Sequence, residues 1–66
     1  MAILKVIEVL SNSNDSWEDA TKRAVKNASK TVKNIRSVYV QEQSAVVKDG
    51  EVEEFRVNLK VTFEIN

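Results

Sequence analysis

Few side chains in this sequence could perform chemistry, because it contains no histidine and no cysteine. Their absence excludes histidine general bases, cysteine nucleophiles and a zinc site built from imidazole or thiolate ligands. Carboxylate, lysine and tyrosine chemistry remain, and the candidates for it are Glu42, Tyr39 and Lys60. Nothing beyond the presence of these three side chains supports catalysis, so we predict that the protein is not an enzyme.

A long strand is predicted at Glu54–Ile65, where apolar and polar residues alternate without a break. At about 3.3 Å per residue it spans on the order of 35 Å, well beyond the usual strand of about 5 to 6 residues. A chain of 66 residues cannot cover the apolar face of so long a strand alone. We therefore expect the cover to come partly from a helix of the same chain and partly from other copies.

The long strand is predicted to form a hairpin with a strand over Arg36–Lys48, because Asp49-Gly50 is typical of a two-residue turn. If Lys48 pairs with Glu51, the register of the whole hairpin follows. The apolar face then holds the pairs Val38–Val61, Val40–Leu59, Glu42–Val57 and Ser44–Phe55, with Val46 beside them. The polar face, the surface predicted to meet a ligand or another subunit, holds Ser37–Thr62, Tyr39–Lys60, Gln41–Asn58 and Gln43–Arg56.

An amphipathic helix is predicted over about Trp17–Asn34, with Ser16 as its N-cap and Asp19 as the acid of a capping box. Small apolar residues at spacings of three and four form one stripe along it. Asn34 suits the left-handed conformation that ends a helix. The preceding run Ile3–Leu10 is rich in β-branched residues and apolar on both sides, which predicts a strand buried on two faces.

Size and charge limit the function classes. One domain over residues 1–66 has room for a core worth only about 3 to 5 kcal/mol, which favours self-association as the stabiliser. Ten basic residues balance ten acidic ones, so we expect neither a nucleic acid nor a membrane as partner. The first ten residues are typical of neither a signal peptide nor a membrane span, and we expect a cytoplasmic protein.

The predicted architecture is α+β: a β-α-β-β chain in which a three-stranded antiparallel sheet curls over one amphipathic helix. Six segments carry a family resemblance through their order and spacing: Lys5–Val9, Ser16–Ala20, Ala28–Arg36, Val40–Gln43, Asp49-Gly50 and Val57–Phe63. In these segments the chain resembles the dodecins, small flavin-binding proteins that assemble as hollow homododecamers. The resemblance implies the same assembly, with the chain itself as its partner.

The resemblance also implies a flavin site, and here the sequence departs from it. Flavin-binding dodecins place a stacking tryptophan just after the Asn-Ile-Arg segment and a glutamine in the last strand, where this chain has Ser37 and Arg56. Gln43 is the predicted neighbour of Arg56. Loss of an aromatic stack, with the large area that an indole buries, implies weak or absent binding of riboflavin or FMN. Trp17, in the first helical turn, is predicted to be a core anchor and not a replacement.

Dodecin-like proteins without this tryptophan resemble cation binders, which makes calcium the alternative ligand. A cage would gather carboxylates at its symmetry axes, although no EF-hand spacing identifies the metal ligands. The predicted function is a non-enzymatic shell that binds or sequesters a small ligand; a calcium-binding variant and a structural protein-interaction module are the alternatives. The available oxygen donors are Asp15, Glu18, Glu42, Glu53, Glu54 and Glu64.

Overall fold

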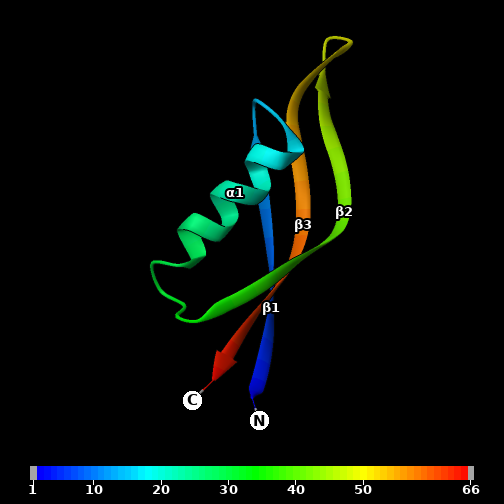
Figure 1. Ribbon diagram of the computed structural model, residues 1–66. Helices are drawn as coiled ribbons and strands as arrows, with labels where there is room; N and C mark the ends of the chain where they lie inside the picture. The colour runs from blue at the N-terminus through cyan, green and yellow to red at the C-terminus, as the bar shows by residue number, and fades with distance from the viewer. Residues whose placement is uncertain (1, 66) are drawn as a thin grey trace.

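The computed structural model describes residues 2–65. The three strands form one antiparallel sheet in the order β1-β3-β2, and α1 lies across one face of it (Figure 1). The predicted α+β fold with β-α-β-β order is confirmed. The elements are β1 (Ile3–Ser13), α1 (Trp17–Ala28), β2 (Ile35–Lys48) and β3 (Glu51–Ile65).

The core lies between α1 and the central strand β3. Every second residue of β3 points toward the helix, and the side chains of Val57, Leu59 and Val61 are at most 1% exposed. They pack against Ala20 and Ala24, whose small side chains let the helix lie close to the sheet. The polar residues that alternate with them face away from α1, and we call that side of the sheet the outer face.

The helix is shorter than predicted, ending at Ala28 and not at Asn34. Ser29 caps it, since its Oγ donates a 2.7 Å hydrogen bond to the carbonyl oxygen of Val25. The following residues are rich in serine, threonine, valine and asparagine, which form helices less readily than alanine or lysine. Asn34 does adopt the predicted left-handed conformation, at a φ of 63°, and it turns the chain into β2 at Ile35.

The predicted hairpin register is correct at both ends of β2 and wrong in the middle. Ser37 to Val40 pair as predicted, and so do Lys48 and Glu51. Between them the register shifts by one, because Gln41 is an extra residue in β2 and Glu53 an extra residue in β3. The predicted partners of Gln41, Glu42, Gln43 and Ser44 are therefore wrong, and the observed pairs are Glu42–Asn58, Gln43–Val57, Ser44–Arg56, Ala45–Phe55 and Val46–Glu54.

This shift moves side chains between the two faces of the sheet. Glu42 and Val46 were predicted on the helix side, but their partners Asn58 and Glu54 place them on the outer face. The carboxylate of Glu42 therefore needs no partner in the core. Bulges also bend strands, and β2 changes direction along its length before it runs up to the hairpin turn (Figure 1).

The hairpin turn has the predicted conformation. Asp49 and Gly50 have φ values of 54° and 78°, both positive as a type I′ turn requires. The turn lies at one end of an elongated subunit of 50 × 20 × 13 Å, and the hairpin projects past the start of α1 (Figure 1).

β1 is covered on one face only within the subunit. Ile7 and Val9 pack against the core from the helix side. Leu4, Val6 and Leu10 point to the outer face and are 54%, 54% and 63% exposed. One chain therefore buries β1 on one face only, whereas burial on two faces was predicted. No helix within residues 2–65 is both long and apolar enough to cross a bilayer.

Candidate functional site

Strand pairing defines which side chains share the outer face. β3 runs down its middle, and four of its outward residues have one neighbour on β1 and one on β2. Apolar side chains gather on the β1 side and polar side chains on the β2 side. From one end to the other, the rows are Val6–Thr62–Ser37, Glu8–Lys60–Tyr39, Leu10–Asn58–Glu42 and Asn12–Arg56–Ser44.

Ser37 and Arg56, two of the predicted site residues, both lie on this outer face, as predicted. They are not neighbours within one chain. Ser37 pairs with Thr62, and positions 56 and 62 of β3 are separated by about 20 Å of extended strand. One ligand of ordinary size would therefore reach both side chains only if it contacted them on different copies of the chain.

The guanidinium of Arg56 is held in place by side chains of the outer face. Its Nε donates a 2.9 Å hydrogen bond to Oδ1 of Asn12, and Nδ2 of Asn12 donates at 3.2 Å to Oε1 of Glu54. The terminal nitrogens of Arg56 form no hydrogen bond within residues 2–65. They remain available to an anionic or carbonyl group.

Gln43, the third predicted site residue, does not lie beside Arg56. The bulge at Gln41 places it opposite Val57, which faces α1, and Ser44 takes the position opposite Arg56. Adjacent residues of a strand point to opposite faces. Gln43 is therefore on the helix side of the sheet and does not belong to the outer face.

Trp17 is a structural residue, as predicted. Its ring packs edge to face on Phe55, with centroids 5.0 Å apart and planes at 76°, and it adjoins the buried core. Its indole Nε1 donates a 2.8 Å hydrogen bond to the carbonyl oxygen of Ser44. Both the ring and the polar group are engaged within the subunit, so Trp17 does not replace the stacking side chain that Ser37 lacks.

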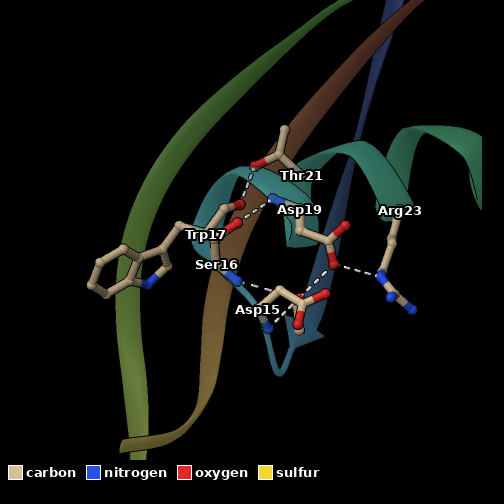
Figure 2. A network of polar contacts seen from close by, with 7 residues as sticks. Asp15, Ser16, Trp17, Asp19, Thr21 and Arg23 are labelled. Carbon is tan, nitrogen blue, oxygen red and sulfur yellow. Dashed lines mark hydrogen bonds and ion pairs between the residues drawn. The ribbon is translucent and has the colours of Figure 1, made fainter.

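The start of α1 is organised by Ser13, the last residue of β1, which lies beyond the strand predicted at Ile3–Leu10 and was not identified from the sequence. Figure 2 shows its partners Asp15, Ser16 and Asp19. Ser13 is 4% exposed, and its Oγ accepts from the backbone nitrogens of Asp15 and Ser16 and donates to Oδ2 of Asp19 at 2.5 Å. The predicted N-cap is confirmed, since Oγ of Ser16 accepts from the backbone nitrogen of Asp19 at 2.9 Å. The carboxylate of Asp19 binds Ser13 and Arg23 and does not return to the Ser16 nitrogen.

These contacts stabilise the charged form of Asp19. The hydrogen bond from Ser13 contributes most to lowering its pKa below the ordinary value of 3.8, and the bond from Nε of Arg23, 2.6 Å long, adds to it. The ordered carboxylate also lies in the first turn of α1, where negative charge is favoured by the helix dipole. We assign this network to helix initiation and not to catalysis.

A cation site does not assemble within one subunit. Residues 2–65 contain no cluster of three or more acidic side chains that could hold a metal ion. Three of the candidate carboxylates have partners of their own: Glu64 accepts from Nε of Arg36 at 3.0 Å, Glu54 accepts from Asn12, and Glu18 is paired with Lys22. A calcium ion would need oxygen ligands from several copies of the chain.

The candidates for catalysis lie on the open outer face. Tyr39 is 64% exposed and pairs with Lys60 as predicted, and Glu42 lies opposite Asn58. A catalytic group needs a partner within hydrogen-bonding reach and some exclusion of water. No hydrogen bond joins these three side chains within the described residues.

Together, these features define a class of small α+β proteins in which an open three-stranded sheet wraps one helix and leaves its other face uncovered. A sequence model of the dodecin family matches residues 3–66. The chain belongs to the dodecin family.

Its relatives include both sequence and structural matches. Calcium dodecin of Mycobacterium tuberculosis is 35% identical over 65 residues, which cover 98% of this chain and 92% of that protein. Its crystal structure, described as having a novel calcium-binding site, superposes with a TM-score of 0.84 over 97% of this chain and 91% of its own. Streptomyces coelicolor dodecin is 29% identical with a TM-score of 0.94, over 98% and 93% of the two chains. A T. thermophilus dodecin variant, 26% identical, also gives 0.94, over 100% and 98%.

Proposed function

We propose that the protein forms a hollow homododecamer that binds and sequesters a small ligand and catalyses no reaction. The observation that carries this proposal is the uncovered outer face of a dodecin-family subunit. Leu4, Val6 and Leu10 are more than half exposed there, beside polar residues of β3. Contiguous apolar side chains on a surface mark an interaction site, and burying each one gains about 1.5 to 3 kcal/mol.

The ligand is not expected to be a tightly bound flavin. Position 37 carries a serine, which cannot stack on an isoalloxazine ring, and Trp17 is engaged with Phe55 and Ser44. The guanidinium of Arg56 only donates hydrogen bonds, whereas a glutamine amide can both donate to and accept from the polar edge of the ring. Riboflavin and FMN are therefore proposed to bind weakly or not at all.

A calcium-binding function is the second candidate, and the similarity to calcium dodecin of M. tuberculosis favours it. In this chain the ion would be bound between copies, because residues 2–65 of one subunit form no acidic cluster that could hold it. Glu42 lies on the outer face and has no ion pair within residues 2–65, so it is the carboxylate we propose to contribute. Calcium is then expected to raise the melting temperature and a chelator to lower it.

Native mass spectrometry of the untagged protein tests the assembly and its contents together. The expected mass is about twelve times the 7.5 kDa of the chain, plus any retained small molecule or ion. A monomer at micromolar concentration would contradict the shell. A heterologous chain in fixed stoichiometry, without a homo-oligomer, would instead support the protein-interaction module. A yellow sample, or quenching of riboflavin fluorescence at sub-micromolar protein, would contradict the proposed loss of flavin binding.

A further inference from the structure

Positive and negative charge are segregated in this chain although its net charge is zero. Residues 20–41 contain no aspartate and no glutamate. This part of the chain comprises most of α1, the turn after it and the first half of β2. Its basic residues are Lys22, Arg23, Lys26, Lys30, Lys33 and Arg36.

A hollow of about 470 Å³ lies beside these basic residues, between α1, β1 and the turn after the helix. Its apolar lining comes from Ile7, Val9 and Leu10 of β1, Ala24 and Ala28 of α1, and Val32 of the turn. The alanines leave the space that larger side chains would fill. The hollow lies beside the edge strand β1, mostly on the helix side of the sheet, and it meets the outer face at Leu10.

Two cationic side chains belong to the lining of the hollow. Arg23 and Lys30 contribute to its lining, together with the amide of Asn27. The same three residues also line a second hollow of about 430 Å³, where Lys22, Lys26 and the acidic Asp19 join them. The two hollows therefore share one basic rim.

Only part of this positive charge is neutralised within the subunit. Nζ of Lys22 lies 3.0 Å from Oε1 of Glu18, and Arg23 is paired with Asp19. Lys26 and Lys30 form no ion pair within residues 2–65. Within the described part of the chain, Lys30 is thus an unpaired cation that lines an apolar hollow.

We propose that this hollow binds a small amphipathic anion: a hydrocarbon body of several carbons that ends in a phosphate or carboxylate group. The hydrocarbon would cover Ile7, Val9 and Ala28, and the anionic group would bind Lys30 and the amide of Asn27. A volume of about 470 Å³ lies within the range of roughly 300 to 1,000 Å³ of small-molecule sites. The apolar lining disfavours a bare inorganic anion, and the free lysine disfavours a neutral lipid.

Isothermal titration calorimetry of the untagged, assembled protein tests this site. Octyl phosphate and octanoate are the two probes, and their comparison identifies the preferred anionic group. At least one is expected to bind saturably at one molecule per chain. Inorganic phosphate and 1-octanol, each lacking half of the recognised chemistry, are expected to bind at least about tenfold more weakly. If neither probe binds saturably, or if 1-octanol binds as well as the anions, the proposal is wrong.

Two variants and a matched control locate the site. Lys30→Gln removes the positive charge that would bind the anionic group. Because this removes one charged hydrogen bond at an exposed site, we expect the affinity to fall about three- to tenfold. Ala28→Phe fills the hollow and is expected to abolish binding. Lys33→Gln removes the same charge from a residue that lines neither hollow, and should leave affinity unchanged.

The comparison of the two lysine variants is decisive because both positions are exposed and neither is part of the core. Equal weakening by Lys30→Gln and Lys33→Gln would show a general attraction of anions to the basic surface and would overturn the proposed site. Unchanged binding by both variants would overturn it as well. Native mass spectrometry of each variant checks that the assembly is intact.

Discussion

The indole Nε1 of Trp17 donates a 2.8 Å hydrogen bond to the backbone carbonyl oxygen of Ser44, across 27 positions of the chain. This contact ties the first turn of α1 to β2. The edge-to-face contact with Phe55 ties the same turn to β3. One side chain therefore holds the helix against both strands of the hairpin near the part that projects past α1.

Replacing Trp17 with phenylalanine tests this role. Trp17→Phe keeps an aromatic ring near Phe55 but leaves the Ser44 carbonyl without its side-chain donor, so we expect a loss of about 1 to 3 kcal/mol in the free energy of unfolding. Urea unfolding followed by far-ultraviolet circular dichroism measures it, since the variant contains no tryptophan. Tyr39→Phe, at an exposed position, serves as the control. Equal stability of Trp17→Phe and the unchanged protein would contradict the role.

Ser13→Ala tests the hydrogen bond that lowers the pKa of Asp19. A carboxylate whose pKa is lowered by folding stabilises the protein above its unfolded pKa, and that stabilisation disappears as the pH falls through the folded value. The variant should therefore melt roughly 4 to 8 °C lower at pH 7, a shift expected for one lost hydrogen bond in a domain of this size. The difference should shrink below about pH 4.

Thermal melts of both proteins at equal concentration, from pH 7 to pH 3, provide the measurement. Asn14→Ala alters an exposed neighbour of Ser13 and is expected to change little. A difference between Ser13→Ala and the unchanged protein that is independent of pH would show that Ser13 acts through its bonds to the backbone nitrogens of Asp15 and Ser16 or through packing, and not through the Asp19 carboxylate.

Restoring an aromatic side chain at position 37 tests the degenerate flavin site. Ser37→Trp would supply the missing stacking surface on the outer face, and we expect riboflavin affinity to rise by on the order of tenfold or more. Quenching of riboflavin fluorescence measures it, with Ser37→Ala as the control. Adding Arg56→Gln should raise affinity further. No gain in the double variant would show that the outer face is not the flavin site of this chain.

A charge in the apolar part of the outer face tests the proposed assembly. Val6 is 54% exposed in one subunit, so Val6→Lys should fold as a subunit but place a lysine where another copy is proposed to pack. We expect the assembled mass to fall to that of smaller species in size-exclusion chromatography with light scattering. Val6→Ile keeps the apolar character and should retain the full mass. An intact assembly of Val6→Lys would place the interface elsewhere.

Local sequence patterns determined most of this fold. The alternation in β3, the Asp49-Gly50 turn and the Ser16 cap each depend on residues close together in the chain, and each was predicted correctly. The position of Ser37 and Arg56 on one face also followed from alternation alone. That face was therefore predictable, although its ligand was not.

Tertiary structure decided the remainder. The bulges at Gln41 and Glu53 moved Glu42 and Gln43 to opposite faces from those predicted. A strand can slip by one residue without changing its local pattern, so packing of the whole sheet against α1 selects where the extra residues fall. The end of α1 at Ala28 and the role of Ser13 depend on short-range hydrogen bonds, from Ser29 to Val25 and between Ser13 and the first turn of α1. Residue preferences alone do not predict these bonds, because they do not decide between helix and turn.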